Sequence, residues 1–290
     1  MGKHLNRAKT YFGTDSRGLF EGGRYALLHT RSLEFDDLRP YVPGDDVRDI
    51  DWKASARHGS VLIKRFVSEK HHKILVVVDA GRNMTALAPS GEVKRDVAAH
   101  VIGAIGLITL GRSDEIGMVY GDSRGSAHIR KRRGETHIEN MIDRFYSHTY
   151  AQPGTSDIVT QLDYVAAGYR RPMLVIVVSD EPDVDPRLEA SLRQLTGRHE
   201  VLWMSVSDMP AVGGPEGDQD GYDVATGGFV LNGATLGPRV IEAYRRAEAA
   251  RAVQLDEFMT AGRVFHTKIG GSAEIRSRVT EVAEAFERAG

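Results

Sequence analysis

The sequence contains no cysteine, and this absence excludes several kinds of protein. A disulfide-stabilised fold, a thiolate nucleophile and a zinc site with cysteine ligands all need that residue. A chain without cysteine suits a reducing compartment, and we expect the protein to be cytoplasmic.

Long apolar runs are also missing. The longest, residues 74–78 and 173–178, are far shorter than the roughly 20 residues that a membrane-spanning helix requires. Residues 1–23 are charged and dotted with glycine, and they lack the apolar stretch of a signal peptide. We therefore expect no membrane insertion.

A strong charge of one sign is the third absence. The 38 basic and 40 acidic residues leave a formal net charge of -2, so no overall field attracts the chain to nucleic acid or anionic lipid. Residues 130–133 form a local basic run without interleaved aromatic residues. One hypothesis is a nucleic-acid-binding protein led by this run; the other, which we favour, is a solvated edge strand that charge protects from aggregation. We expect no nucleic-acid partner.

The sequence does contain an alternation of apolar strands and amphipathic helices. Residues 74–78, 173–178 and 201–206 are apolar runs typical of strands that lie buried on both faces of a parallel sheet. A helix with one apolar stripe, from Val93 to Ile108, follows the first of them. This pattern predicts an α/β fold, Rossmann-like, with a mostly parallel open sheet and helices on both faces.

The remaining segments define the expected domain organisation. Residues 1–23 are expected to form a flexible tail or a short helix, without a core of its own. Residues 24–70 are expected to form a small β-rich segment packed on the main domain, which spans residues 71–290. A flexible insertion rich in glycine, proline and aspartate is expected at residues 209–221. A hairpin and a long helix that begins at Pro238 should follow it.

Two of the predicted central strands end in carboxylates. Asp79 follows residues 74–78, and Asp180 follows the strand at 173–178. Because the carboxyl ends of parallel strands meet at one edge, we expect both side chains to face one crevice. Thr155, in a loop just before a helix, is expected to add a hydroxyl there. Such oxygen ligands suit a hard cation, magnesium or manganese.

Residues 79–84 resemble the Asp-x-Ser-x-Ser-Met signature of the metal-ion-dependent adhesion site (MIDAS) in von Willebrand factor A domains. Both serines are replaced, by Gly81 and Asn83. The resemblance implies a degenerate metal site made of Asp79, Asn83, Thr155 and Asp180, with water as the remaining ligand. The alternative is that the two aspartates cap helices or bind backbone N–H groups without metal.

A longer charged segment, residues 39–57, resembles the hallmark sequence of a bacterial family called domain of unknown function 58 (DUF58), in its short soluble form. The resemblance runs from Phe35 to the C-terminus. It implies a von Willebrand A-like domain that acts as the partner of a MoxR-type AAA+ ATPase and of an unknown client protein. The hallmark residues are Arg39, Tyr41, Gly44, Asp45, Asp46, Arg48, Asp51, Trp52, Lys53 and Arg57.

The hallmark residues predict a network of charge-assisted hydrogen bonds. Gly44 permits a positive φ in a turn, Asp46 can cap a short helical turn, and Trp52 would be the apolar anchor. Two roles remain open and do not exclude each other. The network ties the segment to the main domain, or it forms the surface that docks the ATPase.

We therefore expect a non-catalytic adaptor that binds proteins. The alternative is a metal-dependent phosphohydrolase that uses Asp79 and Asp180, since an aspartate at the end of a first strand can accept a phosphoryl group. Phosphatases of the haloacid dehalogenase type need an acid two positions further on, where this chain has Gly81. No strand-end lysine is evident that would complete a receiver-type site. The sequence also lacks a Walker-type phosphate loop, so we expect no ATP hydrolysis.

Overall fold

The computed structural model of the chain describes residues 2–12, 33–68, 73–211, 220–231 and 237–289. Its centre is a six-stranded sheet in the order β10-β7-β6-β3-β4-β5. The strands are β3 Lys73–Asp79, β4 Glu115–Asp122, β5 Gly125–Arg132, β6 Leu174–Ser179, β7 Glu200–Val206 and β10 Phe265–Ile269. Neighbouring strands are parallel except for β4 and β5. The predicted mostly parallel open sheet is confirmed.

The chain enters the sheet in its middle and then builds it outward in two directions. From β3 it adds β4 and β5 on one side, and it then crosses over to add β6, β7 and β10 on the other. β3 and β6 are parallel neighbours, with Val78 opposite Val178, as the two apolar runs predicted. In open α/β sheets the crevice at such a reversal of strand order, outside the carboxyl ends, is where ligands bind.

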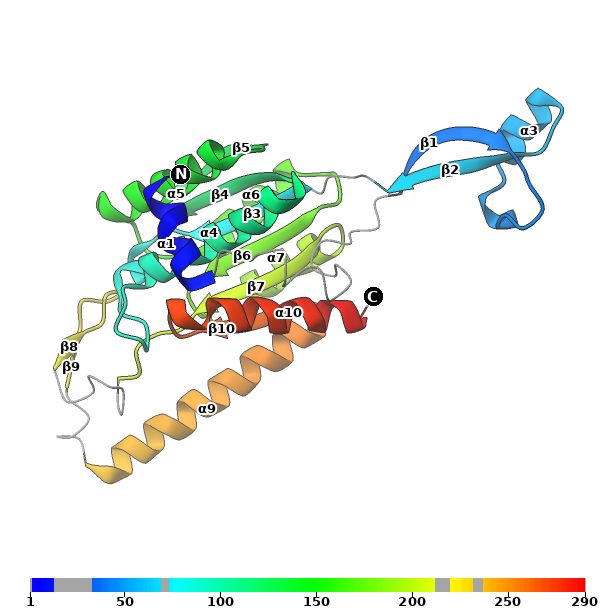
Figure 1. Cartoon of the computed structure of the whole chain (residues 1–290). Coiled ribbons are helices and arrows are strands. Elements are labelled where there is room, and N and C mark those ends of the chain that lie inside the picture. The colour runs from blue at the N-terminus through cyan, green and yellow to red at the C-terminus, as the bar shows by residue number, and fades with distance from the viewer. Residues whose placement is uncertain (1, 13–32, 69–72, 212–219, 232–236, 290) are drawn as a thin grey trace.

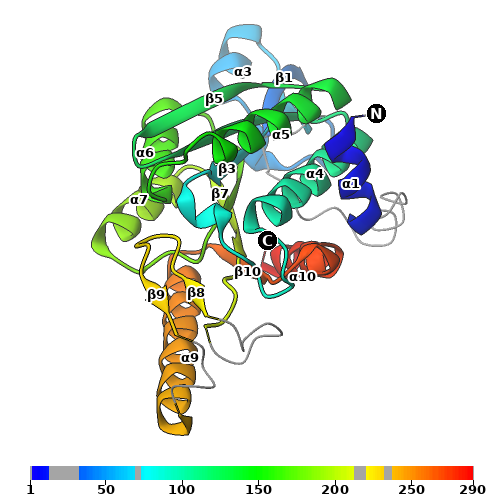
Figure 2. The same cartoon turned by 90° about the vertical axis from the view of Figure 1, so that its left-hand side faces the viewer.

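Helices cover both faces of the sheet (Figures 1 and 2). The side chains of β3 alternate between the two faces of the sheet, because successive side chains of a strand point to opposite faces. Val76 and Val78 join one buried cluster, and Leu75 and Val77 join the other. The first face carries α4 Lys94–Arg112, α5 Glu135–Tyr150 and α10 Ile275–Ala289; the second carries α6 Ile158–Gly168, α7 Pro186–Thr196 and the end of α9 Pro238–Ala261.

In the first part of residues 1–23 the flexible tail is wrong, and the short helix is the alternative that is observed. Lys3–Phe12 forms helix α1, which packs on α4 and α5, while residues 13–32 lie outside the described part of the chain. Leu5, Ala8 and Phe12 are each at most 1% exposed and belong to the main core. These apolar residues are three and four positions apart, so they form one buried face of the helix. Tertiary packing of that face stabilises α1, because a helix of only 10 residues is marginal by itself.

Two details hold α1 in place. A β-carbon added to Gly103 of α4 would lie only 2.5 Å from the Ala8 side chain, so glycine allows the two helices to approach closely. The Glu139 carboxylate accepts hydrogen bonds from the backbone N–H groups of His4 and Leu5, at 2.7 and 3.0 Å. These N–H groups have no partner within the helix, and an anion at a helix N-terminus is stabilising.

Residues 33–68 form an arm, which is how we refer to this segment below. Strands β1 Leu33–Pro40 and β2 Leu62–Ser68 are antiparallel, and η2 Val47–Asp49 and α3 Trp52–His58 lie in their connection. Figure 1 shows the arm extending away from the sheet. The hydrogen bonds of its described side chains join residues of the arm to one another. The predicted β-rich segment is thus observed. Its predicted packing on the main domain is not observed, and its polar side chains bond within the arm instead.

A second projection lies at the opposite end of the molecule. Strands β8 Gly221–Tyr222 and β9 Phe229–Val230 form a small antiparallel hairpin, and the first half of α9 extends beyond the body (Figure 2). Leu255 and Met259 in the last turns of α9 are its buried residues. Of the predicted flexible insertion at 209–221, residues 212–219 lie outside the described residues.

No helix within the described ranges is long and apolar enough to cross a membrane.

Candidate functional site

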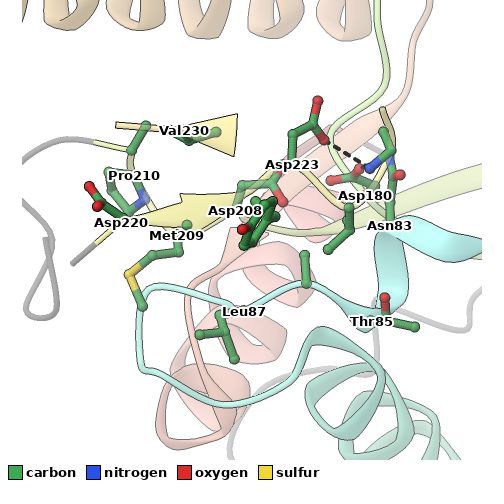
Figure 3. A pocket seen from close by; sticks show the side chains of 16 residues that line it. Asn83, Thr85, Leu87, Asp180, Asp208, Met209, Pro210, Asp220, Asp223 and Val230 are labelled. Carbon is green, nitrogen blue, oxygen red and sulfur yellow. Dashed lines mark hydrogen bonds between the residues drawn. The ribbon is translucent and has the colours of Figure 1, made fainter. Parts of the chain in front are cut away.

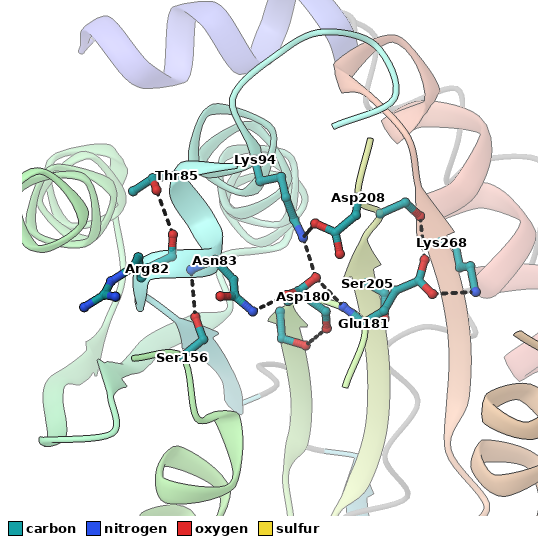
Figure 4. A network of polar contacts seen from close by, with 12 residues as sticks. Arg82, Asn83, Thr85, Lys94, Ser156, Asp180, Glu181, Ser205, Asp208 and Lys268 are labelled. Carbon is teal, nitrogen blue, oxygen red and sulfur yellow. Dashed lines mark hydrogen bonds and ion pairs between the residues drawn. The ribbon is translucent and has the colours of Figure 1, made fainter. Parts of the chain in front are cut away.

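Three carboxylates lie where central strands end, and Figure 4 shows two of them, Asp180 and Asp208. Asp79 is the last residue of β3, Asp180 directly follows β6, and Asp208 lies two residues beyond β7. Asp79 and Asp180 lie at one edge of the sheet, as predicted, because β3 and β6 are parallel neighbours. They do not face one crevice, since Asp79 is only 1% exposed and of the two only Asp180 lines the pocket at this edge. Asp208 joins them since β7 is the next parallel strand.

A buried lysine lies among these carboxylates. Lys94, the first residue of α4, is fully buried. Its ammonium group donates hydrogen bonds to Oδ1 of Asp180 and to Oδ1 of Asp208, the latter at 2.7 Å. A lysine is almost never fully buried unless it is paired, and here two carboxylates supply the pairing. Burial beside Asp180 raises the pKa of Asp208 above its usual range, while Lys94 opposes the rise.

The second oxygen of Asp180 is also occupied. Oδ2 accepts a hydrogen bond of 2.7 Å from the side-chain amide Nδ2 of Asn83, and Oδ1 accepts one of 2.8 Å from the backbone N–H of Glu181. With the ammonium of Lys94, Asp180 therefore has donors on both oxygens. Glu181 pairs in turn with Lys268 at 2.8 Å. The edge is a connected network of ion pairs and hydrogen bonds (Figure 4).

Asp79 forms separate hydrogen bonds at this edge. It is 1% exposed and accepts a hydrogen bond of 2.9 Å from the backbone N–H of Gly81, two residues on. Burial raises the pKa of Asp79 to about 6, and the hydrogen bonds from Gly81 and from the hydroxyl of Ser156 act against that rise. Asp79 thus accepts a backbone N–H group, which is the alternative to metal binding that the sequence left open.

The hydroxyl at this edge comes from a different residue than expected. Thr155 is exposed, whereas the neighbouring Ser156 accepts a hydrogen bond of 3.1 Å from the backbone N–H of Asn83 and bonds to Asp79. The prediction of Thr155 as a ligand is therefore wrong by one position. The loop ahead of α6 presents Ser156 inward because Gly154 is held by Asp122, whose carboxylate accepts its N–H at 2.8 Å.

Gly81 stands where the adhesion-site signature has its first serine, and the structure has no room for one. A β-carbon on Gly81 would lie 2.5 Å from the α-carbon of Ser156 and 2.7 Å from its backbone nitrogen. Real contacts of this kind are never so short, so the loop would have to move. The replacement of the serine is thus coupled to the path of the loop that carries Ser156.

Gly81→Ser should lower the free energy of unfolding by about 1–3 kcal/mol, because overpacking against backbone forces local rearrangement. Chemical denaturation measures this. Gly111→Ser is the control, since nothing lies within 4 Å of a β-carbon there and serine is a better helix former than glycine. An equal loss of stability in both variants would contradict the crowding at Gly81.

The residues present do not fit a magnesium or manganese ion. Gly81 supplies no ligand, Asn83 directs its amide N–H group at Asp180, and Lys94 already places a positive charge on that carboxylate. Within the described ranges no group of three or more His, Cys, Asp or Glu side chains has a metal-binding arrangement. The predicted set Asp79, Asn83, Thr155 and Asp180 is therefore not brought together as a ligand set.

A pocket of about 450 Å³ opens beside this network (Figure 3). Asn83, Asp180 and Asp208 form one wall, and the β8–β9 hairpin forms the other. Tyr222 of the hairpin is 73% exposed. Asp79 is not among the lining residues. The pocket is acidic on its walls but has no exposed nucleophile from β3.

The hallmark residues form a second cluster, on the arm. Arg39 and Asp45 make a bidentate pair with N–O distances of 2.8 and 2.6 Å, and this pairing lowers the pKa of Asp45. The side chain of Asp46 caps η2, and that of Asp51 caps α3. The predicted charge network and the cap at Asp46 are confirmed, and Gly44 has the predicted positive φ, at 110°.

Trp52, which the sequence predicts as an apolar anchor, does not pack inside the arm. Its side chain is 68% exposed at the start of α3. Tyr41 contributes through its backbone, whose N–H donates to Val61 at 2.9 Å. The arm has little apolar core, since its largest apolar side chain, that of Trp52, faces solvent. Caps and ion pairs satisfy its polar groups.

The family model described as a protein of unknown function, DUF58, matches residues 37–221. The chain belongs to the DUF58 family. The match begins in β1 of the arm and includes β3, β6 and the strand-end network, but it ends before α9, β10 and α10, whereas the resemblance in the sequence was expected to reach the C-terminus. The family assignment made from residues 39–57 is confirmed.

Relatives of this DUF58 protein have no assigned function. The uncharacterized proteins Mb1516 of Mycobacterium bovis and Rv1480 of Mycobacterium tuberculosis are 26% identical over 236 residues, 80% of this chain and 73% of each relative. Among solved structures, an aerotolerance-related membrane protein from Bacteroides fragilis matches 74% of this chain and 99% of its own, with 14% identity and a TM-score of 0.48. The von Willebrand A (VWA) domain of SpRpn10 matches 72% and 94%, with 8% identity and a TM-score of 0.36.

Sequence reasoning missed three residues of the strand-end network: Lys94, Ser156 and Asp208. Asp208 carried a usable signal, because it follows the apolar run 201–206 just as Asp180 follows 173–178. Lys94 carried none, since a lysine at the start of a helix is usually exposed. Its burial depends on contacts with residues far away in the chain.

Proposed function

We propose that this DUF58 protein is a non-catalytic adaptor in the cytoplasm, which binds a MoxR-type AAA+ ATPase through its arm and also binds a client protein. The observation that carries the proposal is the exposed apolar surface on a projecting arm. Val42, Val47 and Trp52 are 55%, 60% and 68% exposed, and all three lie in the connection between β1 and β2.

Exposed charge on the same connection supports a docking role. The carboxylates of Asp45 and Asp51 are engaged within the arm, with Arg39 and with the first turn of α3. The side chain of Arg48 is 89% exposed, and Lys53 and Arg57 are exposed as well. Tryptophan and arginine are the residues most enriched at the energetic centres of protein interfaces. The arm therefore offers a partner an exposed tryptophan together with the exposed cations Arg48, Lys53 and Arg57.

The strand-end network supports the non-catalytic part of the proposal. The nucleophile that a phosphohydrolase would need, Asp79, is buried and does not line the pocket. Lys94 lies near Asp180, where a receiver-type site would have a lysine, but it is fully buried in ion pairs. No observation favours the hydrolase over the adaptor.

Affinity purification of the full chain from its native host tests the proposal. We expect an AAA+ ATPase to co-purify with the natural protein, and the Trp52→Ala variant to recover at least tenfold less of it, since loss of an interface centre costs about 2 kcal/mol or more. Tyr150→Ala is the matched control, because Tyr150 is an equally exposed aromatic residue, at 66%, outside the arm. It should recover the ATPase fully.

Two results would count against the proposal. Repeated preparations that enrich no AAA+ ATPase would contradict the adaptor role itself. Undiminished recovery with Trp52→Ala, with the variant's melting temperature unchanged, would contradict the assignment of the arm as the docking surface.

A further inference from the structure

We infer that the buried ammonium group of Lys94 takes the place of a divalent cation at the strand-end site, so that this site is held together without metal. The inference concerns the opposite end of the molecule from the arm, and it stands or fails independently of the ATPase partner.

The position of Lys94 is the first support. Its side chain has no exposed surface, and its ammonium group bonds both to Asp180 at the end of β6 and to Asp208 beyond β7. Of these two, Asp180 is the predicted metal ligand, and Asp208 comes from the neighbouring parallel strand. The ammonium group bridges the two carboxylates, as Figure 4 shows, and so supplies positive charge to Asp180 in place of the predicted cation.

The donors around Asp180 are the second support. A metal-bound carboxylate needs free lone pairs, yet Oδ2 of Asp180 accepts from Nδ2 of Asn83 and Oδ1 accepts from Lys94 and the N–H of Glu181. Hydrogen-bond donors on both oxygens are the surroundings of a carboxylate paired with a protein cation.

Charge is the third support. Asp180 and Asp208 carry two negative charges against one ammonium group, and a divalent cation on the same carboxylates would lie within a few ångströms of that group. Like charges at such separations repel strongly, and water screens little between a fully buried ammonium group and a carboxylate that is 13% exposed. Binding a metal at Asp180 would therefore require Lys94 to leave, although its side chain is fully buried.

The consequence concerns how this edge can bind a partner. A site of the adhesion type holds its partner by letting a partner carboxylate complete the coordination of the metal. With Lys94 in place, the pocket instead presents Asp180, 13% exposed, and Asp208, 50% exposed, to whatever enters it. Any partner contact here is then insensitive to chelators.

The test is a manganese titration of the full-length protein and of Lys94→Met, which keeps the length of the side chain and removes the charge. For the natural protein we expect no heat of binding in calorimetry, and the same melting temperature in millimolar manganese as in EDTA. For Lys94→Met we expect manganese to bind and to raise the melting temperature by roughly 5 °C or more when present at about a hundred times its dissociation constant. Adding Asp180→Asn to Lys94→Met should abolish this shift.

Each outcome decides the question. Stoichiometric manganese binding by the natural protein, lost in Asp180→Asn, would overturn the inference, as would a folded Lys94→Met that manganese does not stabilise. If Lys94→Met does not fold, Lys94→Gln, whose amide can still donate to one carboxylate, replaces it in the same titration. Should neither variant fold, the titration of the natural protein decides, with binding overturning the inference and absence of binding supporting it.

Discussion

Lys94→Met should lower the free energy of unfolding by about 3–5 kcal/mol at pH 7 in EDTA, the cost of removing one partner from a buried ion pair. The substitution leaves Asp180 and Asp208 close together without their cation. Burial and the charge of Asp180 then raise the pKa of Asp208 in the folded variant without Lys94 to oppose the rise. Because the folded variant binds protons more tightly than the unfolded chain, its deficit should shrink as the pH falls from 7 toward 4. Urea denaturation at several pH values measures both effects.

An exposed ion pair provides the control. Arg193 and Glu189 pair on the surface of α7, with side chains 74% and 55% exposed, so Arg193→Met should cost no more than about 0.5 kcal/mol. A loss of less than about 1 kcal/mol in Lys94→Met, similar to that control, would contradict the view that the strand-end carboxylates depend on this lysine.

Phe12→Ala should cost about 3–5 kcal/mol, the usual range for truncating a buried aromatic side chain. Phe12 is 1% exposed and belongs to the same core cluster as residues of α4, α5 and α10. A cost of this size would show that α1, which precedes the region matched by the DUF58 model, is part of the cooperative folding unit. Thermal and chemical unfolding of the full chain measure it.

The neighbouring aromatic residue is the matched control. Tyr11 lies on the same helix but is 39% exposed, and its ring contacts that of His100 at a centroid distance of 4.8 Å. Tyr11→Ala should cost about 1 kcal/mol or less, because little apolar surface is uncovered. Equal costs for Phe12→Ala and Tyr11→Ala, or no cost for either, would mean that the helix does not pack as described.

Predictions that depended on runs of consecutive residues were accurate. The branched apolar runs at 74–78 and 173–178 predicted buried parallel strands, and β3 and β6 are such neighbours. The helix that begins at Pro238 is also observed. These features can be predicted locally, because a strand buried on both faces, or a helix buried on one face, has a short-range pattern of apolar residues.

Predictions about isolated short segments were less accurate. The sequence left a flexible tail and a short helix open for the first residues. What makes them a helix is the space beside Gly103 and the carboxylate of Glu139. In the arm the capping role of Asp46 was predicted correctly, because a cap joins residues two or three positions apart. The exposed fraction of Trp52 could not be predicted, because it depends on the absence of a packed neighbour in space.

The carboxylates at the strand ends illustrate the same division most clearly. An aspartate directly after an apolar run lies at the edge of the sheet whatever surrounds it, so Asp79 and Asp180 could be placed from the sequence. What neutralises them could not, because Lys94 reaches Asp180 and Asp208 across 86 and 114 positions of the chain. Only the stacking of α4 on the sheet brings that ammonium group to the strand ends. The choice between a metal ion and a lysine at this edge is therefore made by tertiary packing, since electrostatic pairing depends on distance in space and leaves no periodic trace in the sequence.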